Sequence, residues 1–208
     1  MNSRKPVIYV VDDDVSVCRA LKLLLKAHGF KVETFPCAKD FLNIKHSKVL
    51  SCLVLDIQMP DINGFALQKA MADRQLAIPI VFITGHGDIP MSEKGMKAGA
   101  VDFLPKPFSK KKLLNAITEA VLKNKIQNKE SAEISKIQRR IKTLSPRELE
   151  VFKLVAGGLM SKEIAFKRGT ALQTIKVHRG RVMKKMQAVT VTELIHFAQK
   201  AGVISSKA

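Results

Sequence analysis

The first half of the chain alternates short apolar runs with amphipathic stretches. The apolar runs are four to six residues long and rich in Val, Ile, Leu and Phe, which is typical of buried strands of a parallel sheet. The stretches between them place apolar residues at helical spacing, as in the stripe from Val17 to Leu25, which ends before Gly29. Five strands alternating with five helices predict a doubly wound α/β domain with a five-stranded parallel sheet.

The order of these elements is read directly from the pattern. The predicted strands are Val7–Val11, Val32–Phe35, Leu50–Leu55, Ile80–Ile83 and Val101–Leu104. After the helix that contains the Val17 stripe, further helices are predicted at Ala38–Ile44, Gly64–Ala72, Met91–Ala98 and Lys111–Val121.

From Ser145 onward the pattern is helical. Ser145-Pro146-Arg147-Glu148 combines a capping box with proline at the first helical position, and Thr190-Val191-Thr192-Glu193 is a second capping box. Between these two starts, glycine-containing turns set off a short helix from Ser161 to Lys167 and a longer one over about Leu172–Met186. These signals predict an all-α four-helix domain.

The segment between the two patterns has its own composition. Residues 123–143 lack glycine and proline, carry many charges and place four isoleucines at loosely helical spacing. We therefore predict a first domain over residues 1–122, a partly helical linker over 123–143, and the four-helix domain over 144–208.

The charge is distributed unevenly over these parts. The chain carries a formal net charge of +18; residues 1–122 hold 17 basic and 12 acidic side chains, whereas residues 123–208 hold 19 and 6. Such an excess indicates an anionic partner, and its position favours contact between the smaller half and a polyanion such as nucleic acid. No apolar run approaches the roughly 18 residues of a membrane span, so we expect no membrane partner.

Two further features place the chain in the cytoplasm. The apolar run Val7–Val11 is short and leads directly into Asp12-Asp13-Asp14, which no signal peptide does. The three cysteines have no metal-ligand spacing and do not suggest a disulfide framework. We therefore expect a soluble, reduced, cytoplasmic protein.

Polar side chains stand where the predicted strands end. Asp12 and Asp13 follow the first strand, Asp56 the third, Thr84 the fourth, and Lys106 comes just after the fifth. Because the carboxyl ends of parallel strands converge, these side chains should meet in one crevice. Crowded carboxylates need a cation, and an all-oxygen donor set suits Mg²⁺. A carboxylate beside Mg²⁺ can attack phosphorus, while a hydroxyl and an ammonium stabilise the phosphoryl oxygens.

The motifs around these residues resemble the receiver domain of two-component response regulators. The resemblance covers residues 5–122, and loop 84–91 looks like the FixJ branch; it implies a flavodoxin-like sheet. The motifs are Asp12-Asp13, Asp56-Ile57-Gln58-Met59-Pro60-Asp61-Ile62-Asn63-Gly64, Thr84-Gly85 and Phe103-Leu104-Pro105-Lys106-Pro107.

This resemblance implies a role for each pocket residue. Asp56 would accept a phosphoryl group from a histidine of a sensor histidine kinase, and Thr84 and Lys106 would contact that group. Mg²⁺ would be bound by Asp12, Asp13, Asp56 and the backbone carbonyl of Gln58.

Two more features follow from the same resemblance. Phe103 would be the aromatic switch that moves on activation. The bond between Lys106 and Pro107 would be cis.

Three motifs stand in the helical half of the chain: Leu144-Ser145-Pro146-Arg147-Glu148, Gly158-Leu159-Met160-Ser161-Lys162-Glu163-Ile164-Ala165 and Thr174-Ile175-Lys176-Val177-His178-Arg179-Gly180-Arg181-Val182-Met183-Lys184-Lys185-Met186. With them, residues 140–204 are similar to the LuxR/FixJ/NarL-type helix-turn-helix domain. Turned at about 100° per residue, the third helix gathers Ile175, His178, Val182 and Met186 on an inward face. The opposite face is basic and slim, as entry into the DNA major groove requires. The candidate DNA contacts are Gln173, Thr174, Lys176, Val177, Arg179, Arg181 and Lys184.

Four positions depart from the usual helix-turn-helix pattern. Arg168 and Thr170 replace apolar residues on either side of the turn glycine. Ala171 replaces the Ser or Thr that normally caps the recognition helix, and Gly180 replaces a longer side chain found in some relatives. Loss of a cap typically costs about 1 kcal/mol, so these changes bear on DNA affinity.

Together, these features favour a transcription regulator rather than an enzyme. Phosphorylation of Asp56 would promote a homodimer that binds double-stranded DNA in a sequence-specific way and acts on RNA polymerase. A phosphatase with an aspartyl nucleophile is one alternative, but such enzymes place Asp-x-Asp after the first strand. A phosphoryl sink that no longer binds DNA is another.

Overall fold

The computed structural model describes residues 5–46, 49–85, 95, 96 and 98–204. The chain divides into two compact units between Asn128 and Lys129. The first, the receiver unit, contains the sheet, and the second, the helical unit, contains the capping boxes predicted at Ser145 and Thr190.

The receiver unit contains a five-stranded parallel sheet in the order β2-β1-β3-β4-β5. This confirms the predicted fold class, and each strand lies within one residue of its predicted bounds. The difference that matters for the candidate site is at the end of β3. This strand ends at Asp56, one residue later than the predicted end at Leu55. The strands are β1 Val7–Val11, β2 Lys31–Phe35, β3 Ser51–Asp56, β4 Ile80–Thr84 and β5 Asp102–Pro105.

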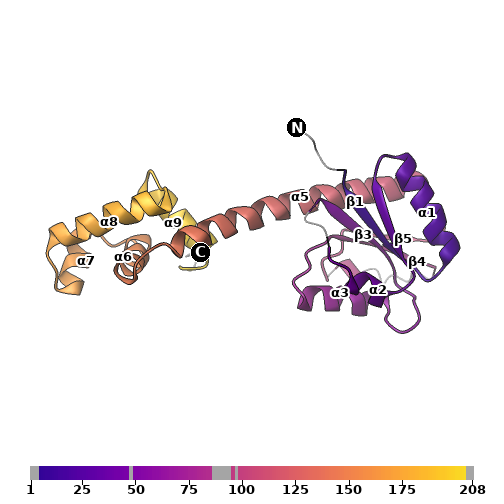
Figure 1. Ribbon diagram of the computed structural model, residues 1–208, viewed down its shortest axis with the longest axis horizontal. Coiled ribbons are helices and arrows are strands. Elements are labelled where there is room, and N and C mark those ends of the chain that lie inside the picture. The colour runs from indigo at the N-terminus through magenta and orange to yellow at the C-terminus, as the bar shows by residue number, and fades with distance from the viewer. Residues whose placement is uncertain (1–4, 47–48, 86–94, 97, 205–208) are drawn as a thin grey trace. The chain divides into compact units, whose positions relative to one another are not determined.

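Helices cover both faces of the sheet, as Figure 1 shows. On one face, α1 and α5 bury Leu21, Leu25 and Leu113 against the strands; on the other, α2 and α3 bury Phe41 and Leu67. Coverage of both faces explains why the strands read as continuous apolar runs. The bounds are α1 Val15–Ala27, α2 Ala38–Asn43, α3 Gly64–Asp73 and α5 Lys110–Ile141; the helix predicted at Met91–Ala98 falls mostly outside the described residues.

The predicted end of the last receiver helix at Val121 is wrong. The helix continues to Ile141, because no glycine or proline interrupts residues 110–141. Asn124 on this helix is buried: its Oδ1 accepts a hydrogen bond from the Ser51 N–H at 3.0 Å, and its Nδ2 donates to the Ala77 carbonyl at 3.1 Å. The boundaries at 122 and 143 stay a prediction.

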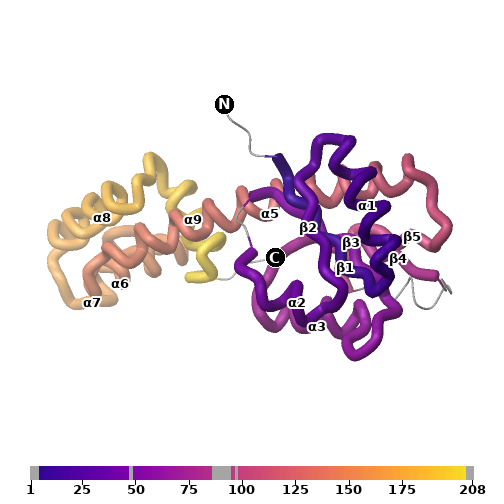
Figure 2. Tube along the Cα trace, turned by 45° about the vertical axis from the view of Figure 1, so that its right-hand side comes forward, coloured from indigo at the N-terminus to yellow at the C-terminus, as the bar shows by residue number. Residues whose placement is uncertain are grey.

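Figure 2 traces helices α6 to α9 of the helical unit. Their core includes Phe152, Ile164, Val182 and Leu194. Both predicted capping boxes are present, and Gly169 takes a left-handed conformation (φ 58°) that ends α7. In the described part of the chain, no helix is long and apolar enough to cross a bilayer. The bounds are α6 Pro146–Ala156, α7 Ser161–Arg168, α8 Leu172–Met186 and α9 Val191–Lys200.

Candidate functional site: an acidic cluster and a basic helix

Three carboxylates meet at the carboxyl ends of β1 and β3. These strands are hydrogen-bonded neighbours in which Val11 pairs with Leu55, so the residues that follow, Asp12 and Asp56, lie side by side. Both are buried, whereas Asp13 is exposed. One oxygen from each of the three carboxylates lies within 4.8 Å of the other two. We refer to these residues as the acidic cluster.

Lys106 joins the acidic cluster from the end of β5. Its Nζ lies 2.8 Å from Asp12 Oδ2 and 3.2 Å from Asp56 Oδ2. The backbone N–H of Lys106 donates to the carbonyl of Thr84 at 2.7 Å, which fixes the Lys106 backbone beside the end of β4. Thr84 itself is fully buried, and the Lys106–Pro107 bond is cis, as the receiver resemblance implies.

Burial and pairing shift the pKa values of Asp12 and Lys106. Burial raises the pKa of Asp12, although hydrogen bonds from Lys106 and from the Asp14 N–H oppose that rise. Burial lowers the pKa of Lys106, but its hydrogen bonds and charge pairing with Asp12 and Asp56 outweigh this and raise it overall. Lys106 therefore stays an ammonium beside the carboxylates of Asp12 and Asp56.

Local structure holds the acidic cluster in shape. Asp14 caps α1, since its Oδ1 accepts hydrogen bonds from the N–H groups of Ser16 and Val17, at 2.7 and 3.3 Å. Those bonds lower the pKa of Asp14, and its own N–H donates to Asp12 Oδ1 at 2.9 Å. Our sequence analysis missed this role, although an aspartate before an amphipathic stretch is a normal helix-start signal.

The loop after β3 approaches Asp56 closely. The Gln58 N–H donates to Asp56 Oδ1 at 3.4 Å. A Cβ on Gly64, at the start of α3, would lie 2.6 Å from the Asp56 carbonyl oxygen, so only glycine fits there. The Asp56-to-Gly64 motif is thus a tight loop that positions a carboxylate.

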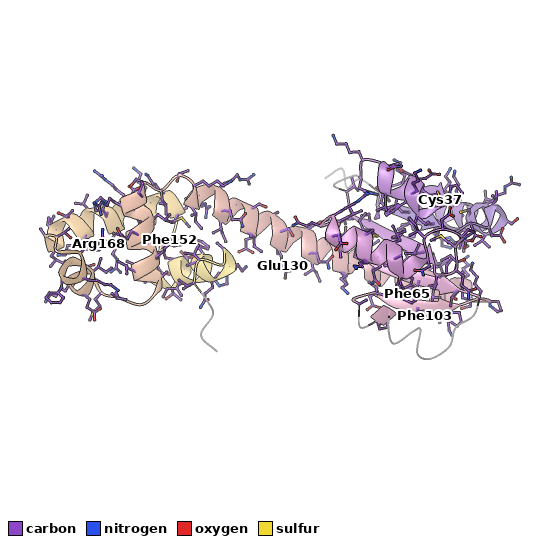
Figure 3. The ribbon with its side chains drawn as sticks, turned by 90° about the horizontal axis from the view of Figure 1, so that it is seen from below. Cys37, Phe65, Phe103, Glu130, Phe152 and Arg168 are labelled. Carbon is purple, nitrogen blue, oxygen red and sulfur yellow. The ribbon has the colours of Figure 1, made fainter. Side chains whose placement is uncertain are left out.

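Phe103 lies on β5 in a row of aromatic rings. Its ring centroid is 6.4 Å from that of Phe82, which in turn is 5.1 Å from that of Phe65 (Figure 3). Phe103 is half-buried, so its ring has both a packed and an exposed side. This position is compatible with the switch role that the resemblance implies.

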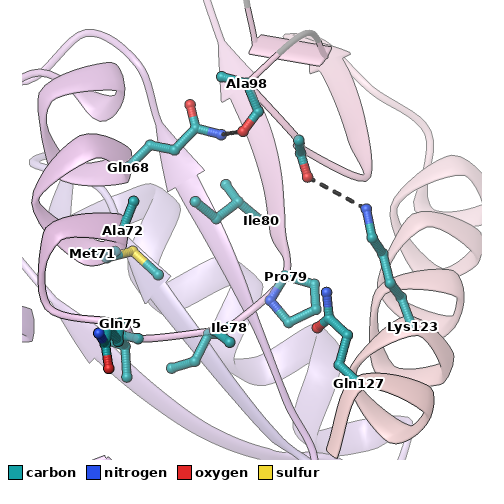
Figure 4. A pocket seen from close by; sticks show the side chains of 13 residues that line it. Gln68, Met71, Ala72, Gln75, Ile78, Pro79, Ile80, Ala98, Lys123 and Gln127 are labelled. Carbon is teal, nitrogen blue, oxygen red and sulfur yellow. Dashed lines mark hydrogen bonds between the residues drawn. The ribbon is translucent and has the colours of Figure 1, made fainter. Parts of the chain in front are cut away.

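A second pocket of the receiver unit, about 400 Å³ in volume, lies away from the acidic cluster (Figure 4). It is lined by residues just before and at the start of β4, whereas the acidic cluster lies at the opposite ends of the strands. Gln68 Nε2 donates to the Ala98 carbonyl at 3.0 Å, and Lys123 Nζ to the Gly99 carbonyl at 3.4 Å. Among the residues that the structure describes, those lining this pocket include no Asp, Glu, His or Cys.

Helix α8 has the two faces that its sequence predicts. Ile175, Val182 and Met186 are buried and His178 is half-buried. The opposite face forms what we call the reading surface; all its residues are exposed: Gln173, Lys176, Val177, Gly180, Arg181 and Lys184.

Two of the candidate DNA contacts lie beside the reading surface. Thr174 is exposed and borders a pocket next to α6. Arg179 is half-buried, and its Nη1 donates to Ser161 Oγ at 3.3 Å, at the start of α7. The structure thus ties Arg179 to the preceding helix, which the helix pattern of α8 alone does not reveal.

The four departures have distinct structural consequences. Ala171 provides no side-chain hydrogen bond to the start of α8, and Gly180 faces open space, where a Cβ would contact nothing within 4 Å. Arg168 forms an ion pair with Glu150 of α6, and Thr170 lines the same pocket as that pair. Arg168 therefore links the end of α7 to α6, and Thr170 lies on the pocket wall near this ion pair.

A buried glutamate anchors the other end of α8. Glu148 Oε2 accepts hydrogen bonds from Lys185 Nζ at 2.6 Å and from the Ser145 N–H at 2.8 Å. Lys185 Nζ also donates to the Thr143 carbonyl at 3.1 Å. The hydrogen bond from Lys185, followed by that from the Ser145 N–H, lowers the pKa of Glu148 to about 2, although burial acts in the opposite direction.

This pairing predicts acid sensitivity of the helical unit. A carboxyl with a pKa near 2 in the folded chain, against 4.5 ordinarily, contributes stability above pH 4.5 that is lost as the pH falls toward 2. Glu148→Gln should lower the free energy of unfolding near neutral pH by about 1–3 kcal/mol and flatten this pH dependence. Hydrogen exchange of α6 and α8 amides across pH 3–6 measures both effects.

The matched control for this experiment is Glu130→Gln, because Glu130 is exposed on α5. In the Glu130→Gln variant, hydrogen exchange of the α6 and α8 amides should follow that of the wild type at every pH. Equal acid sensitivity in wild type and Glu148→Gln would show that Glu148 is not the responsible group.

Comparison with known proteins agrees with both halves of this description. The family described as "Response regulator receiver domain" matches residues 8–118, and "Bacterial regulatory proteins, luxR family" matches residues 142–198. Nodulation protein W of Bradyrhizobium diazoefficiens is 42% identical over 201 residues, which cover 97% of this chain and 88% of that protein. The transcriptional regulatory protein FixJ of the same species is 39% identical over 198 residues, covering 95% and 97%.

Solved structures give the same answer. The response regulator StyR aligns with a TM-score of 0.80 at 43% identity, covering 95% of this chain and 100% of that one. Full-length FixJ from B. japonicum aligns with a TM-score of 0.55 at 38% identity, covering 96% and 98%. The receiver match alone spans more than half of the chain, and relatives well above 30% identity cover nearly all of it. The chain therefore belongs to the two-component response regulators with a LuxR-type DNA-binding domain.

Proposed function

We propose that this chain is a cytoplasmic transcription regulator controlled by phosphorylation of Asp56. The observation that carries the proposal is the acidic cluster: three carboxylates and the Lys106 ammonium at adjoining strand ends. A carboxylate oxygen of Asp56 would attack the phosphorus of a phosphohistidine on a sensor histidine kinase. The P–N bond breaks as the P–O bond forms, and the imidazole leaves with the electron pair.

The donor set of the acidic cluster fits Mg²⁺. All its ligand atoms are oxygens, and Asp13 and Gln58 are exposed, which leaves an open side for water and for phosphoryl oxygens. Asp12, Asp13, Asp56 and the Gln58 carbonyl would hold the ion. When bound, Mg²⁺ neutralises negative charge on the transferring phosphoryl group.

Thr84 and Lys106 would recognise the phosphorylated state. Lys106 already lies within hydrogen-bond distance of Asp56, so its ammonium can move from the carboxylate to a phosphoryl oxygen. Thr84 is buried at the end of β4, one strand from Asp56, where a hydroxyl can donate to the same group. Occupation of this space would change the packing of Phe103 on the neighbouring strand.

The output would be a homodimer formed through the receiver face that includes β5 and α5. Such a dimer brings two copies of α8 to adjacent major grooves of double-stranded DNA, where bound regulators can act on RNA polymerase. The net charge of residues 123–208, with 19 basic and 6 acidic side chains, supports DNA as the partner.

Acetyl phosphate with Mg²⁺ tests this proposal in the purified full-length chain. We expect sedimentation to show an increase in mass, and mobility shift with random genomic fragments to show retention of a subset of fragments. Asp56→Asn is the control and should remain at the unphosphorylated mass. Phosphorylated protein that stays monomeric at micromolar concentration and retains no fragment would support a phosphoryl sink instead.

A further inference from the structure

A pocket of about 450 Å³ lies beside the reading surface of the helical unit. It is enclosed by the first half of α6, the end of α7, the turn and the first half of α8. Thr174 lines it directly after Gln173 of the reading surface. We call it the side pocket, and its position places it next to the side chains expected to enter the major groove.

The charge of the side pocket is positive. Arg147, Lys167 and Arg168 line it, against one carboxylate, that of Glu150. Glu150 forms an ion pair with Arg168 and lies 3.8 Å from Arg147, so the carboxylate holds the two guanidinium groups together. A guanidinium has five N–H donors, and one carboxylate cannot use those of two arginines. Donors therefore remain for a second anion.

The polar groups of the side pocket suit the same kind of anion. Thr170 and Thr174 are exposed on its wall and carry hydroxyl donors. Nδ1 of His178 is buried there without a hydrogen-bond partner, and an imidazole nitrogen can donate to an oxygen. Buried polar atoms are rarely left unpaired, so the pocket fits a polar occupant better than an apolar one.

Two of these residues are departures from the usual helix-turn-helix pattern. Arg168 and Thr170 stand where apolar residues are usual, on either side of Gly169. Both line the side pocket, where they add a guanidinium group and a hydroxyl to its wall. A missing cap at Ala171 weakens the start of α8, while a new anion contact beside that start would hold it against DNA.

We propose that the side pocket binds a phosphodiester of the DNA backbone next to the half-site that the reading surface contacts. This inference rests on the proposed DNA-binding function and extends it to residues of α6 and α7. Arg147, Lys167 and Arg168 provide the charge, and Thr174 connects the pocket to the reading surface. The contact fixes the register of α8 in the groove but does not itself distinguish bases.

Neutral substitution of single charges provides the first test, with phosphorylated full-length protein and a duplex recovered from the genomic mobility shift. Lys167→Gln and Arg147→Gln should each weaken binding to this duplex and to a scrambled duplex alike, by about two- to fivefold. Each should reduce the slope of log affinity against log salt by about 0.9. Lys153→Gln is the matched control, because Lys153 is exposed on α6 outside the pocket.

A scan of single methylphosphonate linkages, which carry no charge, locates the phosphate itself. We expect one position beside each half-site at which neutralisation weakens the wild type but has no further effect on Lys167→Gln or Arg147→Gln. Equal losses at that position in variants and wild type would overturn the proposal. So would a salt slope that Lys153→Gln changes as much as Lys167→Gln does.

The phosphate contact in the side pocket and the proposed DNA-binding function can be tested separately. If Lys176→Ala relaxes sequence preference while no phosphate couples to Arg147 or Lys167, the side pocket is misassigned and DNA recognition stands. If the phosphorylated protein binds no duplex, both proposals are wrong.

Discussion

Asp56→Asn protein incubated with Mg²⁺ and labelled acetyl phosphate is expected to acquire no phosphoryl label, whereas the wild type acquires an acid-stable, base-labile one. Asparagine has nearly the shape of aspartate but lacks the carboxylate oxygen that attacks phosphorus. Asp56 is the member of the acidic cluster that ends β3 and accepts hydrogen bonds from both Lys106 and the Gln58 N–H. Chelation of Mg²⁺ should remove the label from the wild type as well.

Asp61→Asn is the matched control for this experiment. Asp61 belongs to the same loop and is exposed, and its φ of 63° is one that asparagine readily adopts. Its label should equal that of the wild type. Label that persists in Asp56→Asn would mean that another residue accepts the phosphoryl group.

Lys176→Ala is expected to reduce affinity for a selected duplex by about 1–3 kcal/mol and to relax sequence preference, if its ammonium bonds a guanine edge. Lys176 is exposed on the first half of α8, the part of a recognition helix that reaches base edges. Lys184 is exposed on the same face, two turns later. Lys184→Ala should weaken binding to all sequences equally, as the loss of a phosphate contact does.

Titration of both variants against one selected and one scrambled duplex separates these effects. The ratio of the two affinities should fall for Lys176→Ala and stay constant for Lys184→Ala. A constant ratio in both variants would mean that the reading surface is oriented wrongly with respect to the bases.

The receiver fold and most of its site follow from simple sequence rules. Continuous apolar runs predicted buried parallel strands, and the polar residues after them predicted a shared crevice. The prediction of a shared crevice is confirmed for Asp12, Asp56 and Lys106, because the order and direction of the strands fix where the strands end. That prediction required no knowledge of which individual side chains contact each other.

The contacts that sequence reasoning missed join residues far apart in the chain. Asn124 reads as a polar position in a charged helical segment, yet its partners are Ser51 of β3 and Ala77 of the loop before β4. Arg168 reads as a defect of the helix-turn-helix motif, whereas in the fold it pairs with Glu150. The spacing of apolar residues along a helix shows which face is buried. It does not show which polar residue forms a hydrogen bond or ion pair with another part of the chain.

The buried position of Asn124 bears on how the receiver can be isolated as a fragment. A fragment that ends at residue 122 would lack the side chain that satisfies the Ser51 N–H and the Ala77 carbonyl. Ser51 is buried, and a buried backbone group left without a partner costs about 1–3 kcal/mol. A fragment that ends at Asn128 would keep Asn124 together with Asn128, whose Nδ2 donates to Asn124 Oδ1 at 3.1 Å. In parallel thermal melts, the longer fragment should therefore unfold at the higher temperature. Six residues of helix outside the receiver motifs would then decide how stably the isolated receiver unit folds.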